Sequence, residues 1–128
     1  MKAINEFKLE SMTNRQKSFY GKAKVRQYEI GSAVVEVLVS YTSEVAAAVT
    51  FGGKVEIFRL YDEEFFESAE NWRGDLLSGY SHTTGRHIES FFAYLGKAWG
   101  GKRDWINRKP VTFDKVEDYA KSLTLKVA

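Results

Sequence analysis

Two glycine-bearing turns divide the segment from Lys22 to Tyr61 into short runs that are typical of β-strands. Lys22–Ile30 alternates polar and apolar residues, as expected for a strand with one solvated face. After the turn signal Gly31-Ser32, the run Ala33–Tyr41 is rich in β-branched residues, which favour strands. This pattern limits the first half of the chain to a sheet built from consecutive hairpins.

The same pattern continues through two further runs. Thr42-Ser43 is a weaker turn signal that precedes Val45–Phe51. Gly52-Gly53 is a strong signal, because glycine readily adopts the positive φ that such a turn needs at its central residues. Lys54–Tyr61 is the last run. The sequence therefore predicts a four-stranded antiparallel meander over residues 19–61.

Two helices are predicted downstream of the meander. Apolar residues at spacings of three and four place one apolar stripe on a central helix over residues 83–99; they are Ile88, Phe91, Phe92, Leu95 and Trp99. Gly100-Gly101 is expected to end that helix. A second stripe, introduced by a capping-box-like start at Asp114, predicts a C-terminal helix over residues 113–124. The predicted fold class is α+β, with the meander packed against one central helix plus the C-terminal helix.

The chain is predicted to form a single domain over residues 1–128. This length is typical of one domain, and the sequence contains no internal repeat, low-complexity tract or linker. Residues 1–18 are interpreted as a polar arm or short helix, 62–79 as an acidic and aromatic excursion, and 100–111 as a basic, tryptophan-containing loop. Aromatic residues make up 15% of the chain, more than so small a core can hide, which leaves a homodimer open.

The composition excludes several classes of chemistry. The absence of cysteine rules out a disulfide framework, a thiolate metal site and a cysteine nucleophile. The N-terminus has no apolar run of signal-peptide length, and no stretch is long and apolar enough to span a membrane, so we expect an intracellular protein. His82 and His87 lie five residues apart across a turn, which is a poor metal-ligand spacing. No metal and no cofactor are predicted.

A hydroxyl-rich turn before the central helix contains both histidines. The free amides and positive dipole end of the helix could hold a phosphate or carboxylate there, with the anion-binding residues Ser81, Thr83, Thr84, Arg86 and His87. The pattern favours a structural role instead, in which the hydroxyls cap the helix and His87 is a hydrogen-bonded residue at the edge of the apolar stripe. A small nuclease centred on His82, Arg86 and His87 is a further alternative, but no second acid–base cluster complements these residues.

The net charge of +2 is unevenly distributed. A basic segment over residues 97–109 offers Lys97, Lys102, Arg103, Trp105, Arg108 and Lys109 as partner-binding residues, and an acidic segment over 62–75 offers Glu63, Glu64 and Glu67. Basic side chains interleaved with tryptophan could bind nucleic acid through phosphate contacts and base stacking. The same composition suits a protein–protein interface, and neighbouring patches of opposite sign favour a charge-patterned partner.

Three segments carry a family resemblance: Ser18-Phe19-Tyr20-Gly21-Lys22-Ala23, Ser40-Tyr41-Thr42-Ser43-Glu44-Val45-Ala46, and Tyr80-Ser81-His82-Thr83-Thr84-Gly85-Arg86-His87-Ile88-Glu89-Ser90-Phe91. Together they resemble a family of small, largely uncharacterised proteins of bacteriophages and related mobile elements, over roughly Ser18 to Leu95. The excursion at 62–79 and the tail from Lys97 lie outside this resemblance.

The resemblance implies a context, because the family has no assigned activity to carry over. It implies a phage or prophage accessory protein in the cytoplasm of a host cell. Such a protein would act without catalysis, by stoichiometric binding to a host protein or ribonucleoprotein. An inhibitor of host defence, such as an anti-CRISPR protein, is one form of that function. Direct nucleic-acid binding through the basic segment is the alternative.

Overall fold

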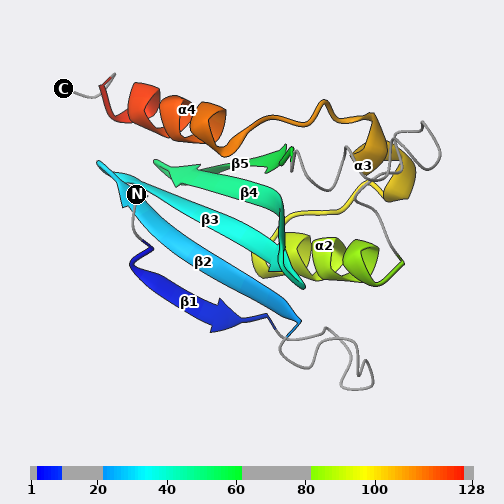
Figure 1. Cartoon of the computed structure of the whole chain (residues 1–128). Coiled ribbons are helices and arrows are strands. Elements are labelled where there is room, and N and C mark those ends of the chain that lie inside the picture. Colours follow the sequence, from blue (N-terminus) through cyan, green and yellow to red (C-terminus); the bar gives the residue numbers. More distant parts are fainter. Residues whose placement is uncertain (1–2, 10–21, 62–81, 126–128) are drawn as a thin grey trace.

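The computed structural model describes residues 3–9, 22–61 and 82–125 of the chain (Figure 1). Five strands and three helices occur in these ranges: β1 (Asn5–Lys8), β2 (Ala23–Ile30), β3 (Ala33–Ser40), β4 (Ser43–Phe51), β5 (Lys54–Arg59), α2 (His82–Tyr94), α3 (Lys102–Asn107) and α4 (Phe113–Leu125). The α+β class and the antiparallel sheet are as predicted. The acidic segment with Glu63, Glu64 and Glu67 lies outside the described residues, as does Ser81.

The sheet has five strands in the order β1-β2-β3-β4-β5, all antiparallel, so the predicted count of four was wrong. The additional strand β1 lies in the region interpreted as a polar arm or short helix. It forms because Phe7 packs against the core and Leu9, just beyond the strand, is 5% exposed, while Lys8 between them faces outward. An alternation over so few residues gives no clear periodic signal in the sequence.

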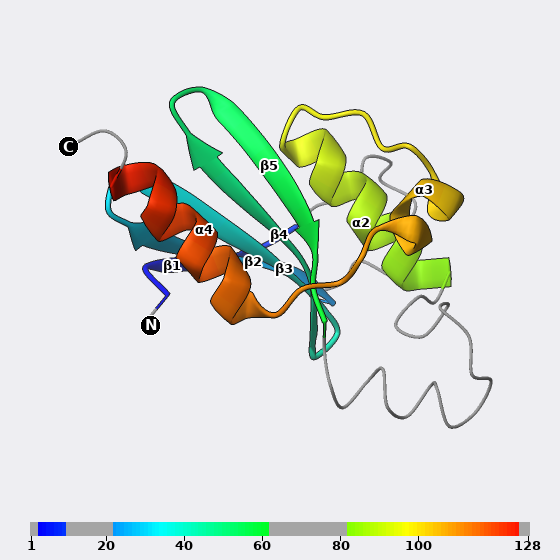
Figure 2. The ribbon, with the colours of Figure 1, turned by 90° about the horizontal axis from the view of Figure 1, so that it is seen from above.

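Helices cover both faces of the sheet, as Figure 2 shows from above. On one face, Val25 and Leu38 belong to a core cluster with residues of α2 and α3. On the other, Val35 and Val37 pack in a second cluster with residues of α4. Because β3 is buried on both sides, its sequence is almost continuously apolar instead of alternating.

Helix α2 ends at Tyr94, five residues before the predicted end at residue 99. Gly96 has a φ of 72°, and its N–H donates to the Ala93 carbonyl while the Lys97 N–H donates to the Phe92 carbonyl. These two bonds form a Schellman motif, so the first glycine after the helix is sufficient to end it. Trp99 is therefore not helical, although it still packs against the core cluster beside α2.

Helix α4 packs across the face of the sheet opposite α2. Val116 and Ala120 are fully buried there, and aromatic contacts join Tyr28 to Phe113 and Phe58 to Tyr119, each with ring centroids 5.3 Å apart. None of the helices in the described ranges is long and apolar enough to cross a membrane.

Candidate functional site

The histidine on α2 holds that helix to the end of β3. His87 is fully buried, and its Nδ1 lies 2.8 Å from the hydroxyl of Ser40, which is 2% exposed. The imidazole also lies against the Tyr41 ring, with centroids 5.7 Å apart. His87 is thus enclosed and has structural partners, so it does not lie on an accessible anion-binding surface. Of the predicted anion-binding residues with a described side chain, Arg86 is the exposed one.

The other predicted residues of this turn are not all placed. Helix α2 includes His82, Thr83 and Thr84, but their side chains lie outside the part that the structure describes. Capping and anion binding by the two threonines therefore stay predictions. Within the described ranges, no group of three His, Asp or Glu residues is arranged to hold a metal ion.

Tyr41 beside this histidine has a strained backbone. Its φ is 58°, a left-handed conformation that costs a residue with a bulky side chain roughly 1–2 kcal/mol. The ring is 47% exposed, and it contacts both the His87 ring and the ammonium group of Lys22, which is 5.6 Å from the ring centroid. The strained turn thus places an aromatic ring beside the buried His87.

The basic segment is a folded element and not the predicted loop, because residues 102–107 form α3. Trp105 is 3% exposed and meets Phe92 edge-on, with ring centroids 5.8 Å apart. Burying this ring fixes α3 against the core beside α2. The prediction of Trp105 as a partner-binding residue was therefore wrong, because its indole is not on the surface.

Arg108 is also used within the fold. Its Nη1 donates to the Ile57 carbonyl at 2.9 Å, and its guanidinium lies 5.6 Å from the Phe92 centroid and 5.7 Å from that of Trp105. A looser ion pair links it to Asp104 at 3.8 Å. These contacts commit a predicted partner-binding cation to the packing of α3 on β5.

A second arginine joins the same two elements, but it belongs to β5 and donates to the main chain at the end of α3. Arg59, at the end of β5, is 4% exposed, and its Nη1 donates to the carbonyls of Ile106 and Arg108 at 2.8 and 3.2 Å. Burial lowers the pKa of this guanidinium from its ordinary value. We call Arg59 and Arg108 the arginine clamp. Sequence reasoning missed Arg59, because nothing near it in the chain indicates that α3 folds over it.

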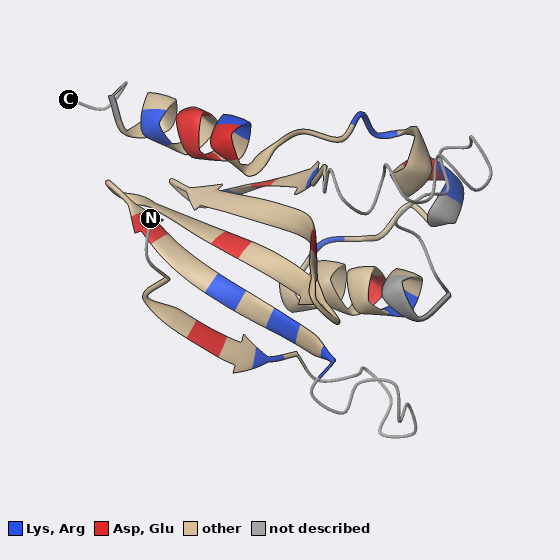
Figure 3. Ribbon diagram, in the orientation of Figure 1, with Lys and Arg blue, Asp and Glu red and all other residues tan. Residues whose placement is uncertain are grey.

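The clamp leaves a different set of cations on the surface. Lys97, Arg103 and Lys109 are exposed, and so is Asp104. Figure 3 shows Lys and Arg positions in blue on the segment that runs from the end of α2 through α3 toward α4. We call the three basic residues the α3 cation surface. The side chain of Lys102 lies outside the described part. Of the basic residues predicted to bind a partner at 97–109, these three are exposed in the structure.

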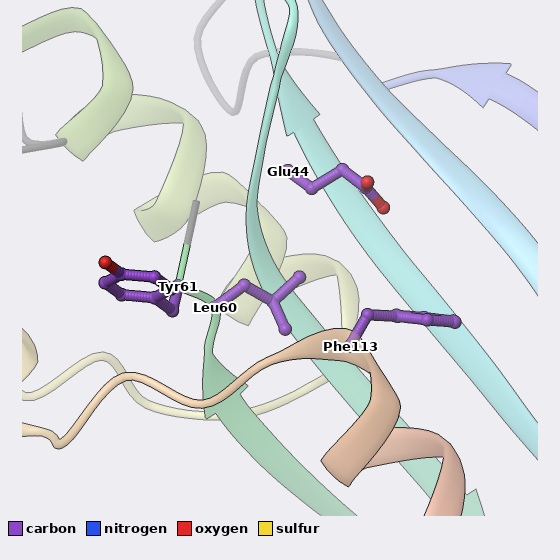
Figure 4. A pocket seen from close by; sticks show the side chains of 4 residues that line it. All are labelled: Glu44, Leu60, Tyr61 and Phe113. Carbon is purple, nitrogen blue, oxygen red and sulfur yellow. The ribbon is translucent and has the colours of Figure 1, made fainter. Parts of the chain in front are cut away.

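A small pocket of about 210 Å³ lies on the face of the sheet that carries α4. It is lined by Glu44, Leu60, Tyr61 and Phe113. In Figure 4, Leu60 lies in the middle, with Glu44 and Phe113 on one side of it and Tyr61 on the opposite side. The polar groups of the pocket therefore do not converge on one point. No sequence pattern indicates this pocket, since the lining comes from three separate segments.

A buried carboxylate occupies the face that carries α2. Glu36 is 7% exposed and accepts hydrogen bonds from Tyr94 and, at 3.0 Å, from Gln27. Burial, together with the hydrogen bond to Glu36 and the charge of Glu36, raises the pKa of Tyr94 to about 12. These partners satisfy Glu36 without a cation, which makes the cluster a structural link between the sheet and the end of α2.

The fold and surfaces define an α+β protein whose five-stranded antiparallel sheet is covered on both faces by helices. A family model matches residues 7–108, so the chain belongs to DUF8033, a family of unknown function. The matched range runs from β1 through α3 and includes both arginines of the clamp, whereas α4 lies beyond it. No curated protein and no solved structure matches the chain.

Proposed function

We propose that this chain is a non-enzymatic binding protein that engages an acidic surface of a protein partner through the α3 cation surface. The observation that carries the proposal is that Lys97, Arg103 and Lys109 are exposed on a segment whose neighbouring residues are anchored in the core. The phage resemblance supplies the context: a host protein or ribonucleoprotein as partner, with inhibition of host defence, for example of a CRISPR system, as the biological outcome.

Preorganisation supports a binding role for this surface. The arginine clamp and the buried Trp105 fix α3 against β5 and α2, so its exposed side chains project from a fixed backbone. A surface that is ordered before binding loses less conformational entropy when the complex forms. Rigid support of this kind is what a specific interface requires.

A protein partner suits the surface better than nucleic acid. Base stacking needs accessible rings, but Trp105 is buried, and Arg108 is committed to the Ile57 carbonyl and two aromatic rings. The exposed carboxylate of Asp104 among the cations would repel a phosphate backbone. A mixed-charge surface matches a protein surface of complementary pattern. A nuclease centred on His87 is the weakest proposal, because its imidazole is enclosed beside Ser40.

Affinity capture from host lysate tests the proposal. The tagged wild-type chain is compared with a triple variant, Lys97→Glu/Arg103→Glu/Lys109→Glu, which reverses the α3 cation surface. The matched control reverses three cations far from α3, at Lys54 at the start of β5 and at Lys115 and Lys121 on α4. Both variants change net charge equally, and circular dichroism confirms that each is folded.

The expected result is one specific protein retained by the wild type and the control, and lost with the α3 variant. Retention should survive nuclease treatment of the lysate. If nuclease removes the partner, and purified chain binds RNA or DNA with strong salt dependence, the nucleic-acid alternative replaces the proposal. If all three chains retain the same proteins, the α3 cation surface is not the binding site.

A further inference from the structure

Among the residues that the structure describes, β1 is the edge strand of the sheet. It pairs with β2 alone, and no other described element lies beyond it (Figure 1). Its residues are exposed except for the half-buried Phe7, whose ring lies 5.5 Å from that of Tyr94. Such an edge presents unpaired main-chain groups to a second strand.

The pairing register identifies which main-chain groups point outward. The Leu9 N–H donates to the Ala23 carbonyl, and Phe7 pairs with Val25 in the same register. Because hydrogen-bonded and non-hydrogen-bonded pairs alternate in an antiparallel ladder, the odd-numbered residues of β1 bond to β2. The N–H and C=O groups of Glu6 and Lys8 therefore face away from the sheet.

The side chains of this edge carry an unbalanced charge. Lys8 lies directly opposite Lys24 in the ladder, and like charges in opposite positions destabilise a strand pair. Glu6 lies opposite Arg26 and accepts a hydrogen bond from its guanidinium at 2.7 Å. A strand that placed a carboxylate on the outer side of Lys8 would relieve the repulsion between the two lysines.

We propose that β1 pairs with β1 of a second copy of this chain, antiparallel, about a two-fold axis at Phe7. In this register Glu6 faces Lys8 of the partner subunit, and Lys8 faces the partner subunit's Glu6. Both residues are the ones whose main-chain groups point outward, so each pair exchanges main-chain hydrogen bonds as well as forming an ion pair. In any other register, either the outward main-chain groups do not face each other or Glu6 does not face Lys8 of the partner subunit.

The axis also brings the two Phe7 rings together. Phe7 faces its own copy as a non-hydrogen-bonded pair, in which opposing side chains lie closest. Aromatic pairs in such positions stabilise antiparallel strands. The sheets of the two copies then form one continuous sheet. Because the paired segment is short, we expect a weak dimer that forms only at high protein concentration.

Charge exchange at the two positions tests the register. Sedimentation equilibrium of the full chain is measured over a wide concentration range for wild type, Glu6→Lys, Lys8→Glu and an equimolar mixture of the two variants. Each variant alone places like charges in both symmetry-related pairs, and should raise the dissociation constant about tenfold. In a mixed dimer, one copy carries lysine at both positions and the other carries glutamate at both. Opposite charges then face each other in both pairs, so the mixture should restore dimerisation.

Folding is controlled within the same set. Lys8→Glu removes the repulsion with Lys24, so its thermal stability should equal or exceed that of the wild type even as it loses dimerisation. The proposal is overturned if the wild type stays monomeric at every concentration. It is also overturned if both variants dimerise as the wild type does, or if the mixture fails to recover. These results are independent of the α3 cation surface.

Discussion

Replacing Arg59 by methionine tests whether the arginine clamp fixes α3. Methionine keeps the apolar length of the side chain but removes the donors to the carbonyls of Ile106 and Arg108. A hydrogen bond from a charged donor contributes about 1.5–3 kcal/mol, and the carbonyls left behind are partly buried. Relief of the burial cost of the guanidinium offsets part of this loss. We expect the free energy of unfolding to fall by about 3 kcal/mol.

This loss translates into a measurable change in melting temperature. An unfolding entropy of about 2.1 cal/mol/K per residue gives about 270 cal/mol/K for 128 residues. A loss of about 3 kcal/mol then lowers Tm by about 11 °C. Urea denaturation followed by circular dichroism gives the free energy, and calorimetry gives Tm, both under a two-state description.

Arg103→Met on the same helix is the matched control. Arg103 is exposed, so this substitution should change stability by no more than about 0.5 kcal/mol. Equal losses in the two variants would refute the reasoning, because they would show that the buried geometry of Arg59 contributes nothing beyond what an exposed arginine does. A loss below about 1 kcal/mol for Arg59→Met would refute it as well.

A turn glycine, a tyrosine with a raised pKa and a buried histidine yield three more predictions. Gly31→Ala should lower the free energy of unfolding by at least about 1 kcal/mol more than Gly52→Ala does, as measured by urea denaturation. Both glycines have positive φ, but of the two only Gly31 is close to α4, where an added Cβ would lie 2.6 Å from Thr124. Tyr94 should titrate near pH 12 when its absorbance is followed at 295 nm, and Glu36→Gln should lower that pKa. Because the pKa of Tyr94 is raised from 10 in the folded chain, the contribution of the protonated tyrosine to stability is complete below pH 10 and is lost as pH rises through 12. His87→Ala should lower the free energy of unfolding by about 3 kcal/mol through a cavity and a lost hydrogen bond, and an unchanged stability would contradict its structural role.

The central strands could be predicted because their signals are local. Glycine turns and β-branched runs define β2 to β5, and each strand pairs with its neighbour in the chain. By contrast, β1 is too short to show a period, and its burial depends on contacts of Phe7 and Leu9 with residues far along the chain. The predicted end of α2 was wrong because helix propensity treats Gly96 as a weakening residue only, whereas its positive φ closes the helix.

The candidate site was harder to predict, because exposure is a property of tertiary packing. Trp105 and Arg108 have the composition of a binding surface, yet the fold buries Trp105 and uses the partly exposed Arg108 to hold α3 on β5. Arg59 stands at a strand end, where an arginine is usually exposed, and is buried only because α3 crosses it. His87 lies at the edge of the predicted apolar stripe, and the end of β3 encloses it.

Lysine footprinting of the complex with the captured partner tests the binding surface most directly. Exposed lysines are methylated in the free chain and in the complex, and the modified peptides are quantified by mass spectrometry. We predict protection of Lys97 and Lys109 in the complex, with Lys54 and Lys115 modified equally in both states, since all four are exposed in the free chain. Unchanged labelling of Lys97 and Lys109, with protection at Lys54 or Lys115, would contradict the assignment of the α3 cation surface as the binding site.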